Sequence, residues 1–545
     1  MGQLQPMFDY NTACAAHESS VPEDFNFGRD VIDFYAKDPH QNALIWCDDK
    51  GNERLLSYSD ISRASNRVAN YLRSRSVEKG DRVIVMLPRI PEWQICMIAC
   101  LKLGAIPIPC ITMLTEKDVH YRVHHAAAVA AITLTSECEK FASCNDALHT
   151  GLSIGGSHGR WEDYALTGSF AETFECSPMQ RLEPAIMYYT SGSTGQPKGV
   201  CHPAQSLFTW RHSARYWLSL TEHDVMWCTA DTGWSKAGTS ILFGPWSQGS
   251  AVLFYDGPYD PVKRFELLSK YKVTVFCAAA TEIRQLLLGP ADHYDLSALR
   301  LSVSAGESVN PEIIGTWEQL TGAPLLDGYG QTETLMTVLN YPGMTVKAGS
   351  MGRPLPGIST GILRESGDVA GPGNEGELLI RLPNTQTMLY YWNDPQRTDR
   401  AFHKTGGVSW FKTGDNVMQD KDGYLFYLGR SDDIINSSGY RIGPQEVENA
   451  LIEHPAVQES AVIGVSDKER GEIVKAFIIL NEPYRPSAAL ILELQEHTKA
   501  VTAPYKYPRQ IEFVSSLPKT VSGKIQRQLL RQHNHAVETL QSPEP

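Results

Sequence analysis

The first part of the chain alternates helical and strand-like patterns of hydrophobic residues. Apolar residues recur at helical spacing from Asp60 to Arg75, and a Lys-Gly-Asp turn separates them from the apolar run 82–87. A second helical segment, 93–103, is followed by the run 105–109. This order of helix, turn, strand, helix and strand is typical of a domain of α/β layers. Further buried strands are expected at 272–278 and 299–304.

The pattern changes after about residue 360, where shorter strands separated by turns are expected. These are 376–382 and 423–428. A compact unit then follows Arg430, with a helix, two strands and a second helix expected at 444–453, 459–465, 474–480 and 490–500. We therefore predict a domain boundary near 429–433, which divides the chain into an N-terminal domain, 1–429, and a C-terminal domain, 430–545.

Composition and charge exclude several classes of protein. A chain of 545 residues is too long for one core of ordinary size. Its net charge of −13 argues against a nucleic-acid partner, which requires a basic face. The eleven cysteines contain no C-x-x-C pair and are expected to be reduced thiols. No apolar run is long enough to span a bilayer, so no integral membrane association is expected.

The N-terminal segment resembles no targeting signal. It is acidic, contains no apolar run, and lacks the arginine-rich amphipathic pattern of a mitochondrial presequence. The predicted location is therefore the cytoplasm.

One segment carries a clear signal for phosphate binding, Tyr189-Thr-Ser-Gly-Ser-Thr-Gly-Gln-Pro-Lys-Gly199. Its glycines allow the backbone to approach a ligand closely, and its hydroxyls and Lys198 can donate to phosphate oxygens. The apolar run 185–187 precedes it, so it is expected to be a loop leaving a strand. It lacks the spacing of a Walker A loop. A flexible surface loop is the alternative, which the fixed lysine and the preceding strand disfavour.

This segment resembles the phosphate loop of the acyl-adenylate-forming superfamily, and further motifs of that superfamily follow in order. They are Ser304-Ala-Gly-Glu307, Asp327-Gly-Tyr-Gly-Gln-Thr-Glu333, Trp410-Phe-Lys-Thr-Gly-Asp415, Gly429-Arg-Ser-Asp-Asp433 and Leu517-Pro-Lys-Thr-Val-Ser-Gly-Lys524. The resemblance implies two domains: a large N-terminal domain of α/β layers plus a distorted β-barrel, and a small mobile C-terminal α+β domain. It assigns ATP binding to Thr190, Ser191, Gly192, Ser193, Thr194, Gly195, Lys198, Gly306, Glu307, Asp327, Gly328, Tyr329, Gly330, Gln331, Thr332, Asp415, Arg430 and Lys524.

Several of these residues have a chemistry that suits the implied role. The Glu333 carboxylate suits Mg²⁺, a hard cation, although a solvated loop charge is the alternative for this residue. Thr332 can donate to the α-phosphate or to the carboxylate under attack. Asp415 can accept hydrogen bonds from both ribose hydroxyls, and its alternative is a turn aspartate. Arg430 offers a planar guanidinium for oxygens of the nucleotide. The resemblance makes Lys524 the cation that stabilises charge on the α-phosphoryl group.

A narrower resemblance, to medium-chain acyl-CoA synthetases, covers nearly the whole chain. It rests on 432–450, 501–509 and 518–527, and near the N-terminus on 22–27 and 85–93. It places Arg441 at the acyl-phosphate end and makes Asp432 the hinge about which the C-terminal domain rotates. Animal members of that group usually carry a mitochondrial presequence, and this chain departs from them there. The resemblance assigns coenzyme A contacts to Ser438, Gly439, Tyr440, Arg470, Lys499, Tyr507, Pro508 and Arg509.

The predicted function is an ATP-dependent acid–CoA ligase that passes through an acyl-AMP intermediate and releases AMP and pyrophosphate, with ATP, Mg²⁺ and coenzyme A as cofactors or co-substrates. Three alternatives stay open: a ligase for short or aromatic acids, an adenylation protein that loads a carrier, and a catalytically silent nucleotide sensor. The presence of Lys524 and Glu333 disfavours the sensor.

The expected acyl substrate is a medium-chain fatty acid. Acetate-selective relatives place a tryptophan just before the Gln-Thr-Glu run, where this chain has Gly330, so a longer or benzoate-like acid is expected to fit. The same glycine equally suits a loop that needs backbone freedom between Tyr329 and Gln331. The acyl pocket is expected near Trp234, Gly238, Gly330 and Leu335.

Overall fold

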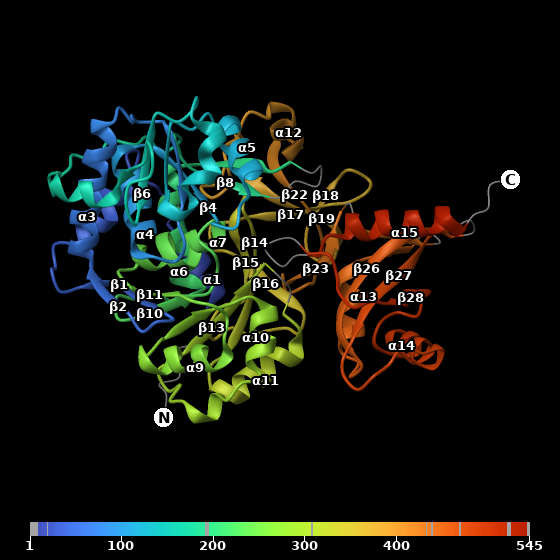
Figure 1. The fold of residues 1–545 in the computed structure, drawn as a ribbon. Coiled ribbons are helices and arrows are strands. Elements are labelled where there is room, and N and C mark those ends of the chain that lie inside the picture. The colour runs from blue at the N-terminus through green and yellow to red at the C-terminus, as the bar shows by residue number, and fades with distance from the viewer. Residues whose placement is uncertain are drawn as a thin grey trace. The chain divides into compact units, whose positions relative to one another are not determined.

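The computed structural model describes residues 9–18, 20–190, 196–306, 309–431, 433–437, 440–467, 470–519 and 525–541. The chain forms two compact units. The first unit comprises Met1–Ser359 and Arg381–Lys404, and the second comprises Thr360–Ile380 and Thr405–Pro545. Figure 1 shows the elements of each unit along the chain.

The main sheet of the first unit has the strand order β2-β1-β11-β10-β12-β13-β14-β15-β16. Neighbouring strands from β1 to β14 are parallel, and the pairs at both ends are antiparallel. The strands are β1 Asn42–Asp48, β2 Glu53–Ser57, β10 Val225–Cys228, β11 Ala251–Asp256, β12 Val275–Cys277, β13 Leu301–Ala305, β14 Leu325–Gln331, β15 Leu335–Leu339 and β16 Ser350–Pro354.

Helices cover both faces of this sheet because its strands are buried on both sides. Leu253 and Phe276 lie in a core with side chains of α9 Pro261–Lys270, α10 Ala280–Leu286 and α11 Pro311–Thr321, which lie along one side of the sheet (Figure 1). The alternate residues Val252 and Val275 lie in a second core with side chains of α4 Pro91–Leu103, α6 Ala204–Tyr216 and α8 Phe243–Ser247. Other helices of the first unit are α1 Tyr10–Ala15, α2 Asp33–Tyr35, α7 Ser235–Ala237, α12 Pro395–Ala401, η1 Gly28–Ile32, η3 Tyr164–Ser169, η4 Gly238–Leu242 and η5 Ala291–His293.

A second, fully parallel sheet of the first unit has the order β4-β3-β5-β6-β7. Its strands are β3 Arg82–Met86, β4 Ile106–Cys110, β5 Ala130–Leu134, β6 Thr150–Ile154 and β7 Glu162–Asp163. Its helices are α3 Tyr58–Ser74, α4 Pro91–Leu103, α5 Glu116–Ala126 and η2 Thr135–Cys144. A capping box between Ser57 and Asp60 starts α3, and Gly104, at φ 78°, ends α4. A small antiparallel sheet pairs β8 Pro184–Thr190, β9 Lys198–Pro203 and β20 Tyr390–Tyr391.

The second unit contains two groups of strands. The first group has the order β18-β17-β19-β22-β23 and the second β25-β24-β27-β26, with β28 beside β27. Val462 and Ile463 are neighbours on β26, and they belong to different cores, one with α13 and α14 and the other with α15 on the opposite face (Figure 1). The elements are β17 Thr360–Leu363, β18 Val369–Ala370, β19 Glu375–Leu382, β22 Val408–Gln419, β23 Leu425–Arg430, β24 Ile435–Ser437, β25 Tyr440–Ile442, β26 Val457–Asp467, β27 Gly471–Leu480, β28 Gln510–Phe513, α13 Pro444–Ile452, α14 Ala488–Val501 and α15 Arg527–Gln541. Along the chain, β21 Phe402–Thr405 spans the point where the first unit ends and the second begins.

The observed elements confirm the predicted α/β class and the predicted order of helices and strands. The strand expected at 272–278 is shorter, Val275–Cys277, because Lys272 adopts a positive φ of 50° and ends the turn before it. The compact units group 360–380 and 405–430 with the C-terminal segment. The domain boundary predicted near 429–433 stays a prediction. The distorted barrel also stays a prediction.

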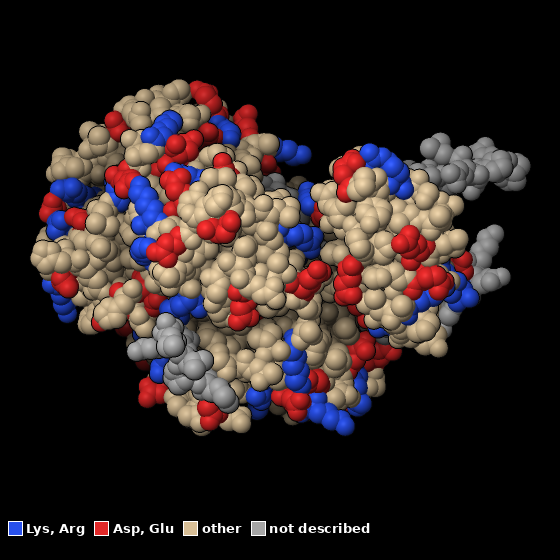
Figure 2. All heavy atoms as spheres, turned by 90° about the horizontal axis from the view of Figure 1, so that it is seen from below, with Lys and Arg blue, Asp and Glu red and all other residues tan. Residues whose placement is uncertain are grey.

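Surface features complete the fold. Basic and acidic side chains are interspersed on the face drawn in Figure 2. Within the described residues, no helix is both long and apolar enough to cross a membrane. All eleven cysteines are unpaired thiols.

Candidate active site

The predicted phosphate loop joins two strands of the first unit. β8 and β9 form an antiparallel hairpin whose register pairs Thr190 with Lys198. The residues between them, Ser191, Gly192, Ser193, Thr194 and Gly195, lie outside the described residues. The Tyr121 hydroxyl of α5 donates to the carbonyl of Pro197 at 2.9 Å, which ties the returning strand to a helix. The Thr190 hydroxyl is buried and has no hydrogen-bond partner among the described residues, so it is a donor suited to a phosphate oxygen.

Lys198 meets Glu333 and Tyr391 in one buried cluster. Its ammonium lies 2.5 Å from Glu333 Oε1 and 3.2 Å from the Tyr391 hydroxyl, which itself donates to Glu333 Oε1 at 2.9 Å. Burial works to raise the pKa of Glu333, but the Lys198 charge and the two hydrogen bonds outweigh it and hold that pKa below its ordinary value. The cluster therefore keeps an ionised carboxylate beside the phosphate hairpin.

The donor set at Glu333 fits Mg²⁺. Magnesium in nucleotide sites is usually held by one or two carboxylates together with phosphate oxygens. The Lys198 ammonium and the Tyr391 hydroxyl both contact Glu333 Oε1. Glu333 would therefore hold the cation together with phosphate oxygens of the nucleotide.

Thr332 is positioned by two side chains that the sequence did not reveal. Its carbonyl accepts a hydrogen bond from His202 Nε2 at 2.6 Å, and its hydroxyl lies 3.1 Å from the Ser235 hydroxyl. Burial lowers the pKa of His202 to about 4, so the imidazole is neutral and its one proton is on Nε2, facing the carbonyl. No motif in the sequence singles out His202 or Ser235, so only the fold brings them to Thr332.

Two groups of the predicted ATP-binding residues lie at the carboxyl end of β13 and along β14. Gly306 has a φ of 92°, which suits glycine at this turn, while Glu307 lies outside the described residues. Asp327 is buried, and burial raises its pKa to about 7 although the Gly328 N–H donates to Oδ1 at 2.9 Å. Tyr329 and Gln331 follow Gly328 on the same strand. The Lys236 ammonium donates to the carbonyl of Ala305 at 3.1 Å, which fixes the end of β13.

Gly330 stands where β14 turns toward β15 and is required by the backbone. A Cβ at this position would lie 2.2 Å from the carbonyl oxygen of Leu335, and Leu335 itself has a positive φ of 56°. A tryptophan here therefore needs a different hairpin backbone. This geometry favours the backbone interpretation of the glycine over the open-pocket interpretation.

Gly238 faces an aromatic wall. A Cβ there would lie 2.8 Å from the Tyr188 hydroxyl and 2.9 Å from the Trp210 ring. Trp210 stacks on Phe243 at 4.7 Å between ring centroids. Trp234, at the start of α7, is half-buried against the same core. The predicted acyl-pocket residues Trp234 and Gly238 thus belong to an apolar, aromatic region.

In the second unit, strand register brings Asp415 and Arg430 together. They are paired residues of β22 and β23, with Arg430 Nη1 3.2 Å from Asp415 Oδ1. Gly414, at φ 70°, makes room for this guanidinium, because a Cβ there would lie 2.7 Å from Arg430 Nη2. Asp415 is only 4% exposed, and the Arg430 guanidinium is its counter-charge. This is a preformed carboxylate suited to a pair of hydroxyl donors.

The predicted coenzyme A residues fall partly together. Lys499 and Arg509 both lie over the Tyr507 ring, at 4.3 and 4.9 Å, and Arg509 donates to the Tyr507 hydroxyl at 2.8 Å. Pro508, between Tyr507 and Arg509 in the chain, is buried. Tyr440 is 52% exposed and stacks on Tyr505, and the Arg470 N–H caps a turn by donating to Asp467.

Several predicted positions lie outside the described residues. They are Asp432, Ser438, Gly439 and Lys524. The side chain of Arg441, on β25, also lies outside the described part of the chain. Their neighbours are defined: Asp433 accepts from Arg531 at 2.7 Å, and a β-bridge joins Lys519 to Ile525 on either side of 520–524.

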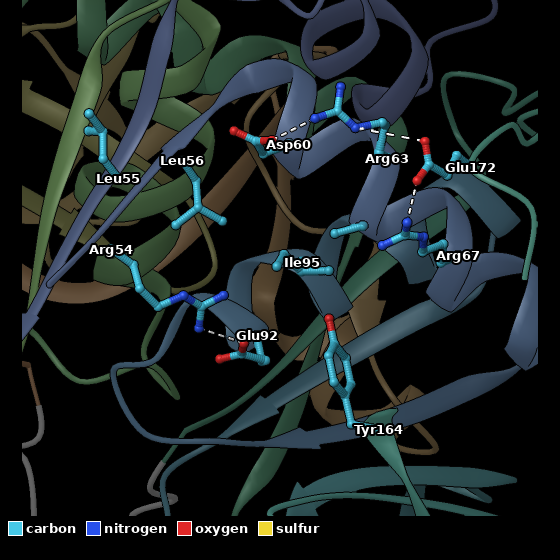
Figure 3. A pocket seen from close by; sticks show the side chains of 11 residues that line it. Arg54, Leu55, Leu56, Asp60, Arg63, Arg67, Glu92, Ile95, Tyr164 and Glu172 are labelled. Atoms are coloured by element: carbon cyan, nitrogen blue, oxygen red, sulfur yellow. Dashed lines mark hydrogen bonds and ion pairs between the residues drawn. The ribbon is translucent and has the colours of Figure 1, made fainter. Parts of the chain in front are cut away.

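A surface cavity of about 650 Å³ in the first unit shares no residue with these positions. Figure 3 shows its arginines paired with carboxylates: Arg54 with Glu92 at 2.7 Å, Arg63 with Asp60 at 2.6 Å, and Arg67 with Glu172. The charges cancel, so the cavity is not a basic site.

Comparison with known proteins identifies the class. The model of the AMP-binding enzyme family matches residues 33–392, and that of its C-terminal domain matches 446–524. Acyl-coenzyme A synthetase ACSM3, mitochondrial, of Rattus norvegicus is 41% identical over 531 residues, which cover 94% of this chain and 91% of the relative. The crystal structure of the anthranilate CoA ligase AuaEII in complex with anthranoyl-AMP has a TM-score of 0.85 at 30% identity, covering 95% and 99% of the two chains. A benzoate CoA ligase from Burkholderia xenovorans has a TM-score of 0.82 at 28% identity, covering 93% and 100%.

The fold and these matches define an AMP-binding enzyme with its C-terminal domain. The chain belongs to the AMP-binding enzyme family.

Proposed function

We propose that the protein is an ATP-dependent acid–CoA ligase that forms an acyl-CoA through an acyl-AMP intermediate. The observation that carries the proposal is the buried cluster of Lys198, Glu333 and Tyr391 beside the phosphate hairpin, with Thr332 next to it. The similarity to acyl-coenzyme A synthetases and acid–CoA ligases supports the same chemistry.

The first step is adenylation. A carboxylate oxygen of the acid attacks the α-phosphorus of ATP, the bond to the bridging oxygen breaks, and pyrophosphate leaves. The Thr190 hydroxyl and the Lys198 ammonium donate to phosphate oxygens, and Thr332 is aligned by His202 for the reacting groups. Mg²⁺, bound by Glu333 and phosphate oxygens, would neutralise phosphate charge. Lys524 is proposed, on the family resemblance, to stabilise charge on the α-phosphoryl group.

The second step is thioester formation. The coenzyme A sulfur attacks the acyl carbon, the bond from that carbon to the AMP oxygen breaks, and the thiol proton passes to solvent. Asp415 is proposed to hold the ribose hydroxyls, with Arg430 keeping its carboxylate in place. Lys499 and Arg509, gathered on the Tyr507 ring, offer two cations for the phosphates of coenzyme A. Ser438, Gly439 and Arg441 keep the roles that the resemblance implies.

The proposed substrate is a medium-chain fatty acid. The aromatic wall of Tyr188, Trp210 and Phe243 around Gly238 suits an apolar chain. It suits an aromatic ring as well, and two structural neighbours are ligases for anthranilate and benzoate. Aromatic and short-chain acids are therefore the second candidates.

Pyrophosphate release tests the proposal. Purified protein with ATP, Mg²⁺ and octanoate should release pyrophosphate, and addition of coenzyme A should give octanoyl-CoA and AMP. Glu333→Gln should reduce pyrophosphate release by about 10² or more, because it removes the carboxylate charge at the phosphate site. The matched control is Glu222→Gln, an exposed carboxylate of the same unit.

The same assay separates the rival functions. A silent sensor would bind ATP without acid-dependent pyrophosphate release. A carrier-loading protein would form acyl-AMP but leave free coenzyme A unused. Either result contradicts the ligase proposal.

The compartment is tested separately. The sequence predicts the cytoplasm, whereas the name of the matched rat relative places that protein in mitochondria. Fractionation of cells that express the untagged chain would decide between them.

A further inference from the structure

Helix α5 carries two histidines on one face. His120 and His124 are four residues apart, which places them one turn from each other, and their ring centroids are 4.2 Å apart. A capping box between Thr115 and Asp118 fixes the start of this helix. Both imidazoles are exposed, and neither has a hydrogen-bond partner in the part of the chain that the structure describes.

A buried thiol and a carboxylate from the following segment complete this face. Cys144 ends η2, and its sulfur lies with the two imidazoles in a group whose ligand atoms are all within 4.8 Å of one another. Asp146 Oδ1 lies 4.0 Å from His124 Nε2. Tetrahedral Zn²⁺ brings such nitrogen and sulfur ligands to roughly 3.5 Å from one another. Rotation of the two exposed imidazoles can bring the ligand atoms from within 4.8 Å of one another to this shorter spacing.

We propose that His120, His124 and Cys144 form a Zn²⁺ site, with Asp146 as the fourth ligand. Imidazole and thiolate ligands favour Zn²⁺ over the hard cations Mg²⁺ and Ca²⁺. Binding replaces the thiol proton by the metal and releases it to solvent, since zinc binds the thiolate. Burial raises the pKa of the Cys144 thiol, so the metal works against this cost.

The site is separate from the predicted catalytic residues but lies on the helix that supports the phosphate hairpin. On a neighbouring face of α5, Tyr121 donates to Pro197, and His125 Nδ1 lies 2.7 Å from the Tyr189 hydroxyl. A metal that ties α5 to η2 would stabilise this helix. We therefore expect Zn²⁺ to raise the thermal midpoint of the protein.

Metal binding to the full chain tests the proposal. Chelator-treated wild-type protein is titrated with Zn²⁺ by calorimetry and with Co²⁺ by absorption spectroscopy. One Zn²⁺ per chain is expected, and Co²⁺ should give a thiolate-to-metal charge-transfer band. His120→Ala, an exposed change that should leave folding intact, should weaken Zn²⁺ binding by more than about tenfold. Cys144→Ser should remove the charge-transfer band.

Matched controls lie close by. Cys138→Ser changes another buried thiol of η2, and His223→Ala changes an exposed histidine elsewhere in the first unit. Both should bind Zn²⁺ like the wild type. The proposal is overturned if His120→Ala binds Zn²⁺ unchanged, if Co²⁺ gives no thiolate band, or if the controls lose binding equally.

Discussion

At the scale of single residues, His202 shows how a buried neutral group fixes a reacting loop. Its Nε2 proton is directed to the carbonyl of Thr332, and burial holds its pKa at about 4. Protonation would place a charge in the core that the nearby Glu333 carboxylate offsets only in part. It would also require Nδ1 to find an acceptor, which the Ser206 hydroxyl at 3.3 Å supplies only weakly.

His202 therefore makes stability depend on pH. An unfolded histidine titrates near pH 6.5, so between about pH 6.5 and 4 the unfolded state binds more protons than the folded state. The contribution of neutral His202 to the free energy of unfolding is fully present above pH 6.5. It is lost as the pH falls to about 4, and the total loss is about 3 kcal/mol. We expect His202→Gln to flatten the dependence of the thermal midpoint on pH over this interval. His212, whose pKa burial also lowers, stays in both proteins and cancels in the comparison. Equal slopes would contradict the assignment.

Gly330 gives a second prediction at this scale. Because a Cβ would meet the carbonyl oxygen of Leu335 at 2.2 Å, Gly330→Ala and Gly330→Trp should both lower stability and reduce activity toward acetate and octanoate alike. The control is Gly315→Ala in α11, where a Cβ meets nothing within 4 Å and alanine favours the helix by about 1 kcal/mol. A Gly330→Trp enzyme that keeps acetate activity and loses only octanoate would restore the open-pocket interpretation.

At the scale of elements, the hydrophobic pattern predicted most of the helices and strands because each has a strong local signal. Helix α3 has a capping box and α4 begins at Pro91 and ends before Gly104, so their limits could be estimated from the sequence. The family motifs likewise gave Lys198 and Glu333. Tyr391, His202 and Ser235 could not be predicted, because strand pairing and packing, not local sequence, bring them to the site.

The segment 520–524 leads to a prediction about the first half-reaction. Lys524→Ala should reduce adenylation by orders of magnitude and spare thioester formation from pre-made acyl-adenylate, since the cation stabilises charge only in the first transition state. The control is Lys519→Ala, whose ammonium pairs with Glu459 at 2.7 Å. Equal loss in both half-reactions would show that Lys524 serves both steps or the fold.

The connection between β23 and β24 leads to a prediction about the second half-reaction. Asp432→Pro fixes φ at the predicted hinge and should preserve acyl-AMP formation while thioester synthesis falls sharply. The next residue is well held, because Asp433 donates its N–H to Arg430 and its carboxylate binds Arg531. Asp432→Ala, which keeps φ free, is the control. Normal thioester synthesis by a folded proline variant would exclude a hinge here.

At the scale of the whole molecule, acyl selectivity depends on both half-reactions and is best measured as kcat/KM for complete thioester synthesis. Each buried methylene contributes about 0.8 kcal/mol, and octanoate carries several more than acetate. Ordering of the chain offsets part of this gain, so we expect kcat/KM for octanoate to exceed that for acetate by about 100-fold.

The aromatic wall near Gly238, and no longer the space at Gly330, is the physical reason for this expected preference. A panel of acetate, butyrate, octanoate, decanoate and benzoate at fixed ATP and coenzyme A would measure it. Preference for benzoate would favour the aromatic-acid alternative, because a flat ring gains from contact with aromatic side chains what a flexible chain gains from its length. Preference for acetate would contradict the medium-chain proposal, because the extra methylenes of octanoate would then contribute no binding free energy.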